Sequence, residues 1–243
     1  MSLASLPDGY RAAVFGASGG IGRAFVDLLT ADPRCAGIYA GSRRADATPY
    51  DTVTPFHFDL TDTASLAASA ETVGAPDLVI VATGALHGPA LTPEKSLRSI
   101  ESASLQESFA INAIGPALIA RHVLTRLPRS RRTLFAALSA KVGSISDNRL
   151  GGWHSYRASK AALNMLIRTI AVELARTHPE TVCVALHPGT VDTPLSKPFQ
   201  AGVAADRLFT PEKSATHLLS VLDKLQPANS GRLFGWDGQE ITP

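Results

Sequence analysis

Residues 12–22 read AAVFGASGGIG, and this stretch decides the fold. Its first four residues predict a short buried strand, and the glycines after Phe15 permit a tight turn. A helix with an apolar face is predicted to follow. Because backbone N–H groups and the positive end of a helix meet at such a turn, it can bind the phosphates of a dinucleotide. The turn alone is weak evidence, since strand-to-helix turns also use glycine for structural reasons.

The rest of the sequence alternates between strands and helices. Apolar runs predict strands near residues 12–15, 37–41, 53–58, 78–82, 133–138 and 182–186, with a short last strand near 232–234. Three-and-four spacing predicts helices near 20–31, 62–73, 101–127, 155–178 and 211–225. This alternation is typical of an α/β protein with a single-domain Rossmann fold, a doubly wound parallel sheet with helices on both faces. Because no linker or repeat interrupts it, we expect one domain over residues 1–243.

The most informative pair of residues is Tyr156 and Lys160, four apart in the helix predicted at 155–178. They share one helix face, so the lysine ammonium is expected to stabilise the tyrosine anion and to lower the pKa of the phenol. Such a phenol could exchange protons near neutral pH. The alternative is a surface pair without function, because any Tyr and Lys can occur at this spacing.

Asn112 lies four residues before Pro116 in the helix predicted at 101–127. Proline has no N–H to donate to the Asn112 carbonyl, so the helix is expected to kink there and to leave that carbonyl free for a water molecule. A kink without function is the alternative.

Glycines and polar residues follow the ends of six predicted strands. They are Gly16, Ser42 with Arg43, Asp59, Thr83 with Gly84, Ser139, and Pro188 with Gly189. Ligands of doubly wound sheets bind outside the carboxyl ends of the strands, which lie along one edge. The sequence therefore predicts a single site at that edge.

Together these features resemble the short-chain dehydrogenase/reductase family, from about residue 11 to the C-terminus. The turn from Phe15 to Gly22 is similar to the family's Thr-Gly-x-x-x-Gly-Ile-Gly, and Tyr156 and Lys160 resemble its catalytic Tyr-x-x-x-Lys. Residues 138–145 and 152–157 look most like the branch of bacterial C-factor and the sniffer-type carbonyl reductases. The resemblance implies a nicotinamide-dependent oxidoreductase that forms a homodimer or homotetramer.

The resemblance also implies the roles of individual residues. Tyr156 would be the general acid/base, Lys160 would hold the nicotinamide ribose, Asn112 would hold a relay water, and Ser139 would bind the carbonyl. The implied cofactor-binding residues are Gly16, Ser18, Gly19, Gly20, Ile21, Gly22, Ser42, Arg43, Asp59, Leu60, Gly84, Tyr156, Lys160, Pro188, Gly189, Val191 and Thr193. Of these, Asp59 and Leu60 resemble adenine contacts, and residues 190–193 resemble the segment that orients the carboxamide.

The sequence departs from the family pattern at three places. The family's Asn-Asn-Ala-Gly is Val-Ala-Thr-Gly at residues 81–84, which puts sheet-stabilising polar contacts in doubt. Phe15 replaces a threonine but leaves the turn intact. The Ser-Ser pair at the fifth strand is Ser139-Ala140, so two candidates remain for the serine that polarises the substrate. Strand alternation turns Ser139 away from the pocket, which favours Ser144 in the following loop, whereas a strand end is better preorganised, which slightly favours Ser139.

The second predicted strand bears on the choice of cofactor. It ends in Gly41-Ser42-Arg43-Arg44, without the acidic residue that usually holds the ribose hydroxyl of NAD. Arginine matches a phosphate in geometry and charge, so NADP is favoured and NAD stays possible. The alternative is that both arginines are ordinary solvated loop charges.

Composition argues against other classes of protein. A net charge of +2 provides no basic field for nucleic acid or for a membrane surface, and no stretch reaches the roughly 18 apolar residues of a membrane span. The 7 histidines and 2 cysteines have no metal-ligand spacing, so no metal site is predicted. Without an export signal or a disulfide framework, a cytoplasmic location is expected. No Gly-x-Ser-x-Gly elbow supports a hydrolase.

The sequence thus predicts an oxidoreductase that transfers a hydride between NADP(H) and a small-molecule carbonyl or alcohol. Segments near 144–153 and 194–210 are expected to form the substrate pocket. Its apolar walls are predicted to be Leu150, Trp153, Leu195 and Phe199. A cofactor-binding redox-sensing or signalling protein with weak or no turnover is the alternative, because Ala140 and residues 81–83 depart from the catalytic pattern.

Overall fold

The computed structural model describes residues 2–45, 49–88 and 91–243. Within these residues, eight strands form the central sheet in the order β10-β9-β6-β5-β4-β1-β2-β3. The strands are β1 (Tyr10–Phe15), β2 (Cys35–Ser42), β3 (Val53–His57), β4 (Leu78–Val81), β5 (Thr133–Leu138), β6 (Thr181–His187), β9 (Leu233–Gly235) and β10 (Glu240–Ile241). Only β10 runs antiparallel to its described neighbour. The sheet order confirms the predicted Rossmann architecture.

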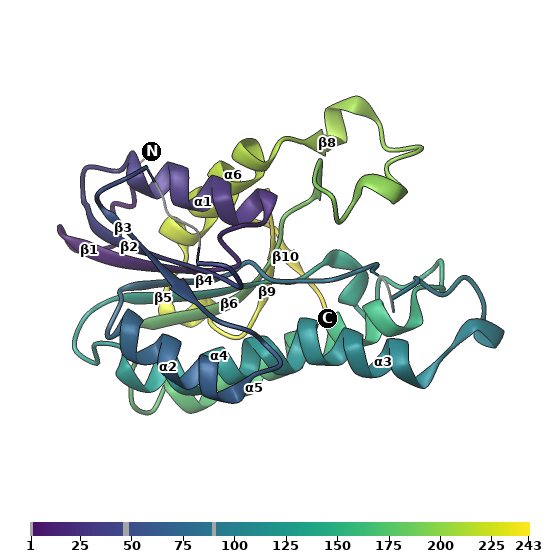
Figure 1. The fold of residues 1–243 in the computed structure, drawn as a ribbon, viewed down its shortest axis with the longest axis horizontal. Coiled ribbons are helices and arrows are strands. Elements are labelled where there is room, and N and C mark those ends of the chain that lie inside the picture. The colour runs from purple at the N-terminus through teal and green to yellow at the C-terminus, as the bar shows by residue number, and fades with distance from the viewer. Residues whose placement is uncertain (1, 46–48, 89–90) are drawn as a thin grey trace.

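Helices cover both faces of the sheet (Figure 1). The helices α1 (Gly20–Thr30) and α6 (Pro211–Lys224) pack together on one face, and α2 (Thr63–Val73), α4 (Gly115–Val123) and α5 (His154–Leu174) lie on the other. The central strand β1 explains this arrangement, because Ala12 and Val14 belong to the core under α1 and α6, whereas Ala13 and Phe15 belong to the opposite core. A strand buried on both faces reads as a continuous apolar run.

Three short strands and a set of helical turns were not predicted. The strands β7 (Thr190–Val191) and β8 (Leu208–Phe209) form a small separate sheet, and β10 extends the edge of the large one. The 3₁₀ turns are η1 (Leu97–Ser99), η3 (Leu124–Arg126), η4 (Lys141–Gly143), η5 (Lys197–Phe199), η6 (Ala205–Arg207) and η7 (Pro227–Asn229). Elements of two or three residues are too short to produce a periodic pattern in the sequence.

The helix predicted at 101–127 is interrupted. The helix α3 (Ser102–Phe109) is followed by a π-helix, η2 (Ala110–Ile114), and only then by α4. The Gly115 N–H donates to the Ala110 carbonyl, five residues back, where an α-helix would bond four back. Pro116, which has no N–H, stands directly after the change. The predicted irregularity is therefore present as a π-turn that contains Asn112.

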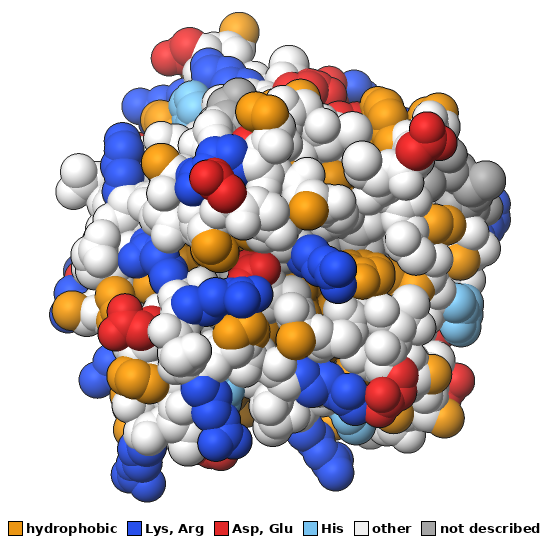
Figure 2. All heavy atoms as spheres, turned by 90° about the vertical axis from the view of Figure 1, so that its left-hand side faces the viewer, with side chains coloured by type: hydrophobic (Ala, Val, Ile, Leu, Met, Phe, Trp, Pro, Cys, Tyr) orange, Lys and Arg blue, Asp and Glu red, His pale blue; other side chains and the backbone are white. Residues whose placement is uncertain are grey.

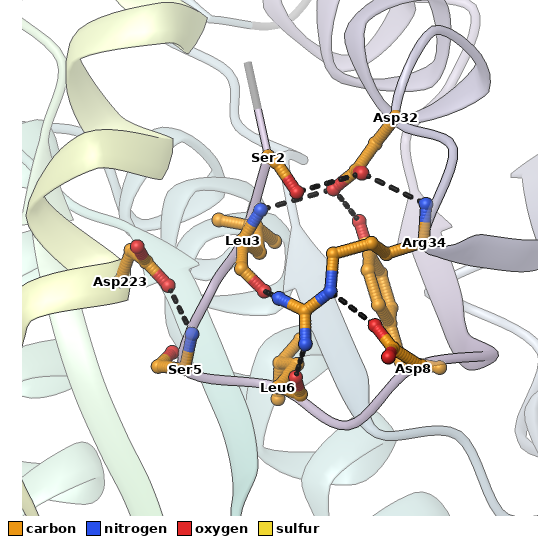
Figure 3. Close-up of polar contacts among 9 residues, drawn as sticks. Ser2, Leu3, Ser5, Leu6, Asp8, Asp32, Arg34 and Asp223 are labelled. Carbon is orange, nitrogen blue, oxygen red and sulfur yellow. Dashed lines mark hydrogen bonds and ion pairs between the residues drawn. The ribbon is translucent and has the colours of Figure 1, made fainter.

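The first residues of the chain are held against the body of the protein by Asp32 and Arg34 (Figure 3). The buried Asp32 carboxylate accepts hydrogen bonds from the Leu3 N–H over 3.0 Å and from the Tyr10 hydroxyl over 2.9 Å. The Arg34 guanidinium donates to the carbonyl of Leu3 over 2.5 Å and to that of Leu6 over 2.6 Å. Leu3 and Leu6 are buried in the core beside α1 and α6, so this segment is part of the fold.

Charged side chains are mixed on the face shown in Figure 2, where Lys and Arg are spread among acidic and hydrophobic residues. Two arginines shortly before β5 have specific partners in the structure. Arg131 donates to the buried Asp77 carboxylate over 2.7 Å, and Arg132 bonds the Leu225 carbonyl. Among the described helices, none is long and apolar enough to cross a membrane.

Candidate active site

The glycine turn after β1 is closed by its own backbone. Gly16 has a φ of +94°, and the Gly19 N–H donates to its carbonyl over 3.0 Å. A Cβ at Gly22 would lie 2.0 Å from the Gly16 oxygen, so no other residue fits there. Gly19 is the N-cap of α1 and provides no side-chain cap, which leaves the first N–H groups of that helix without a side-chain acceptor.

The structure brings the turn against a segment about 170 residues later in the chain. A Cβ at Gly20 would lie 2.7 Å from Cγ2 of Thr193, so the start of α1 touches the segment after β6. Gly189, in this segment, has a φ of +78°, and a Cβ there would meet the Phe209 ring at 2.9 Å. Val191 pairs with Phe209 in the small sheet, and Pro188 accepts a hydrogen bond from Ser214 at 2.8 Å. These predicted cofactor residues therefore lie beside the glycine turn.

A second group of predicted residues meets at Gly84. A Cβ at this glycine would lie 3.4 Å from Oδ1 of Asn112 and 3.5 Å from Nζ of Lys160. Lys160 is buried in α5, and its ammonium donates to the Leu138 carbonyl at the end of β5 over 2.8 Å. Three elements, namely the segment after β4, the π-turn and α5, thus converge where the sequence predicts catalysis.

Tyr156 lies above Lys160 on the same helix, and the lysine nitrogen is 5.8 Å from the centre of the phenol ring. The predicted lowering of the tyrosine pKa is wrong for this structure. Burial raises the pKa of Tyr156 to about 12, because the ionised form would lose its hydration. Burial also lowers the pKa of Lys160 to about 7. The phenol therefore keeps its proton at neutral pH.

The two serine candidates have other partners. Ser139 Oγ donates to Oδ1 of Asn164 over 2.7 Å, whereas the next residue, Ala140, packs against Tyr156. Ala140 is extended, so neighbouring side chains point to opposite sides. Ser144 Oγ donates to the Thr242 carbonyl near the C-terminus. The slight preference for Ser139 thus loses its geometric basis, and this strand end presents a methyl group to the phenol.

The surroundings of Tyr156 are apolar. Its ring is 6.2 Å from that of Trp153, and Trp153 lies 5.1 Å from Phe199, both in edge-to-face contact. Leu86 and Leu195 complete this cluster. Both predicted pocket segments, 144–153 and 194–210, therefore contribute residues to this cluster. Leu150, a predicted wall residue, is 91% exposed and is not part of this cluster.

The ends of β2 and β3 place the predicted ribose and adenine residues together. Arg43 is exposed, and hydrogen bonds from Thr61, together with the Arg43 charge, lower the pKa of Asp59. The Ser42 hydroxyl accepts from the Ala45 N–H over 3.0 Å. Leu60 packs against Gly115, where a Cβ would lie 2.7 Å from its Cδ2. Ser18 and Gly19 are exposed, and Gly20 and Ile21 are half-buried, at the start of α1.

Sequence reasoning missed two residues near this site, Ala85 and Glu94. Ala85 bonds the Asn112 side chain through its backbone. The Glu94 carboxylate is buried at the start of α5. A backbone group and a glutamate in a polar stretch give no signal in a single sequence. Thr83, which the sequence places after the fourth strand, has a buried hydroxyl without a partner among the described residues. Among the described residues, no group of His, Cys, Asp and Glu could hold a metal ion.

The arrangement is that of an NAD(P)-dependent oxidoreductase. The sequence profile of the short chain dehydrogenase family matches residues 11–204, and the chain belongs to this family. It is 35% identical over 147 residues to C-signal of Myxococcus xanthus, a match covering 60% of this chain and 82% of that protein. It is 33% identical over 140 residues to a 1-hydroxy-2-glutathionyl-2-methyl-3-butene dehydrogenase of Rhodococcus. That match covers 58% of this chain and only 59% of the Rhodococcus enzyme.

Solved structures confirm the fold. An NADPH-bound carbonyl reductase from chicken fatty liver is similar with a TM-score of 0.83 and 25% identity, over 98% of this chain and 96% of that chain. The carbonyl reductase Sniffer of Drosophila melanogaster has a TM-score of 0.82 and 19% identity, over 98% of this chain and all of that chain. These neighbours and C-signal agree with the family branch predicted from the sequence.

Proposed function

We propose that the protein is an NADPH-dependent carbonyl reductase for uncharged, apolar carbonyl compounds, with Tyr156 as the proton donor. The observation that carries this proposal is the setting of Tyr156. The phenol is 9% exposed, keeps its proton at neutral pH and lies among Leu86, Trp153, Leu195 and Phe199, with Lys160 beneath it. A buried acid beside apolar walls suits a substrate whose polar atom is a carbonyl oxygen.

The residues at the carboxyl ends of the strands fit a dinucleotide. The N-terminus of α1 has no side-chain cap, and its N–H groups suit a pyrophosphate. The Thr83 hydroxyl, buried beside Gly16 without a partner among the described residues, suits a further polar group of the ligand. The exposed Arg43 suits the 2′-phosphate that distinguishes NADP from NAD. The NADPH named for the chicken reductase supports the same choice.

A reduced dinucleotide held by these residues would supply the hydride for the carbonyl carbon. As the carbonyl oxygen gains negative charge, Tyr156 donates its hydroxyl proton and the product leaves as an alcohol. The ammonium form of Lys160 stabilises the phenolate left behind, which is then reprotonated from solvent. Ala140 offers no hydroxyl, so we propose that Tyr156 is the side chain that hydrogen-bonds the substrate oxygen, with backbone groups or water as further donors.

Two observations favour a second candidate, a cofactor-binding signalling or redox-sensing protein. The methyl group of Ala140 stands where the family's serine is expected, and the chain is similar to a protein named C-signal. Such a protein would bind the dinucleotide with little turnover.

A panel of carbonyl compounds, assayed with NADPH and with NADH, separates the two candidates. Loss of reduced-cofactor absorbance with aromatic or aliphatic ketones and aldehydes, faster with NADPH, is expected. A titration of each cofactor without substrate accompanies the panel. Tight binding of NADPH without turnover of any carbonyl would favour the signalling candidate, and absence of binding to both cofactors would exclude both proposals.

A further inference from the structure

The helix that carries Tyr156 begins in an unusual way. The three residues before it, Gly151, Gly152 and Trp153, have φ values of +63°, +66° and +51°. Trp153 is the N-cap of α5 and makes no side-chain cap hydrogen bond. A left-handed conformation is unfavourable for a non-glycine residue, so other contacts must hold Trp153 in place. The first N–H groups of the helix also need acceptors, which a helix does not provide for itself.

Glu94, about sixty residues earlier in the chain, provides both the contact that holds Trp153 and an acceptor for the first N–H groups of the helix. Its backbone carbonyl accepts the Trp153 N–H over 2.5 Å. Its carboxylate accepts the Ser155 N–H at 3.2 and 3.3 Å and also the Ser155 hydroxyl. The glutamate thus caps α5 from outside the helix, in place of a local N-cap residue.

The Glu94 carboxylate is charged although it is buried. Glu94 is 3% exposed, and among the described residues no Lys or Arg forms an ion pair with it. Burial raises the pKa of Glu94, but the hydrogen bonds from Ser155 and from the backbone of Glu94 itself, together with the electrostatic effect of His154, outweigh burial and hold the pKa below its usual range. The charge therefore rests against the positive end of α5, which stabilises it.

We propose that Glu94 is a positioning residue of the active site, fixing the first turn of α5 and thereby the Tyr156 hydroxyl. Tyr156 directly follows Ser155, and the Trp153 ring lies against the Tyr156 ring. By bonding Trp153 and Ser155, Glu94 therefore holds the two residues that adjoin Tyr156. The proposed proton transfer depends on the placement of one oxygen atom. The expected effect on catalysis rests on the proposed function. The expected effect on the first turn of α5 rests on the hydrogen bonds of Glu94 alone.

The test compares Glu94→Ala, Glu94→Gln and the control Glu101→Ala. Glu101 is exposed and directly precedes α3 without making a side-chain cap hydrogen bond, so it is a glutamate beside a helix N-terminus that caps nothing. Amide hydrogen exchange at residues 154–157 should quicken roughly 10- to 100-fold in Glu94→Ala, because a hydrogen bond to a charged group is lost. Glu94→Gln keeps an acceptor and should show a smaller change, and Glu101→Ala should show none.

Turnover by the same variants tests the catalytic consequence. Glu94→Ala should lower kcat roughly 10- to 100-fold with little change in NADPH affinity, and Glu94→Gln should recover part of the loss. Unchanged exchange in folded Glu94→Ala would overturn the inference, as would quicker exchange with an unchanged kcat. A wild-type protein that reduces no carbonyl would instead count against the proposed function, and the exchange measurement would still decide the role of Glu94.

Discussion

The side-chain amide of Asn112 pairs with both backbone polar groups of Ala85. Its Oδ1 accepts the Ala85 N–H over 2.9 Å, and its Nδ2 donates to the Ala85 carbonyl over 2.8 Å. The second Nδ2 hydrogen reaches the Ser159 hydroxyl at 3.2 Å. Because both donors are used, Asn112 acts as a clamp that holds the segment after β4 against α5. The side chain therefore has no donor left for a relay water, which would have to bind an acceptor of Asn112, either its main-chain carbonyl or the second lone pair of Oδ1.

The first prediction concerns the proton donor. Tyr156→Phe removes only the hydroxyl, so the variant should fold and bind NADPH like the wild type while kcat falls about 10²- to 10⁴-fold. Thermal unfolding and a cofactor titration check the first two expectations, and steady-state reduction of a verified carbonyl checks the third. Near-normal turnover would show that another group donates the proton.

A second prediction concerns cofactor choice. If Arg43 binds the 2′-phosphate, Arg43→Ala loses a charge-assisted hydrogen bond worth about 1.5–3 kcal/mol, which corresponds to roughly 10- to 150-fold in the dissociation constant of NADPH. The affinity for NADH should hardly change. Arg44→Ala, at the next exposed position, is the matched control. Equal weakening of NADPH and NADH would argue against the assignment of NADP.

The third prediction addresses the replaced serine. Since Ser139 bonds Asn164 and Ser144 bonds the C-terminal segment, Ser139→Ala and Ser144→Ala should each lower kcat less than about 5-fold. Ala140→Ser, which adds a hydroxyl beside the phenol, should raise kcat about 5-fold or more, because a new donor meets the developing negative charge. A large loss in only one serine variant would identify that serine as the missing donor.

The fourth prediction is a pH dependence of stability due to Lys160. Burial places its pKa at about 7 in the folded protein, below the unfolded value of 10.5. Between these values the unfolded chain binds the proton more strongly, so the wild type should gain stability relative to Lys160→Met as pH rises from 7 to 9. The gain is at most about 1.4 kcal/mol per pH unit. Urea unfolding at each pH measures it, and parallel pH profiles would contradict the burial of a neutral lysine.

The fifth prediction concerns the N-terminal segment. The Asp32 carboxylate, only 3% exposed, also accepts from Ser2 and from the Arg34 N–H, each over 3.0 Å. Asp32→Asn should therefore lower the free energy of unfolding by about 2–3 kcal/mol. The exposed Asp8, which pairs with the Arg34 side chain, offers the control Asp8→Asn, expected within about 1 kcal/mol of wild type. Comparable losses in both variants would show that burial does not matter here.

Most of the architecture could be predicted from periodicity, because the parallel strands are buried on both faces and the helices carry apolar stripes. Pro116 predicts the interruption of the helix at Asn112, although it does not predict a π-turn. The meeting of Gly84, Asn112 and Lys160 could be predicted from the sequence, but the surroundings of each side chain could not. The pKa of Tyr156 depends on burial by residues from three distant segments, and a sequence reveals the neighbouring Lys160 but not that burial. The direction of Ser139 and the capping role of Glu94 likewise depend on tertiary packing.

The aromatic contacts around Tyr156 allow ligand binding to be followed by tryptophan fluorescence. Of its two tryptophans, Trp153 touches Tyr156 and Phe199, whereas Trp236 stacks on His217 at 5.3 Å. Replacing Trp236 with phenylalanine would leave one indole, that of Trp153, in the apolar cluster around Tyr156. Its emission would respond to any molecule that displaces Phe199, and a reduced nicotinamide nearby would absorb that emission. Ligand binding could thus be measured as a change in tryptophan fluorescence before any substrate is known.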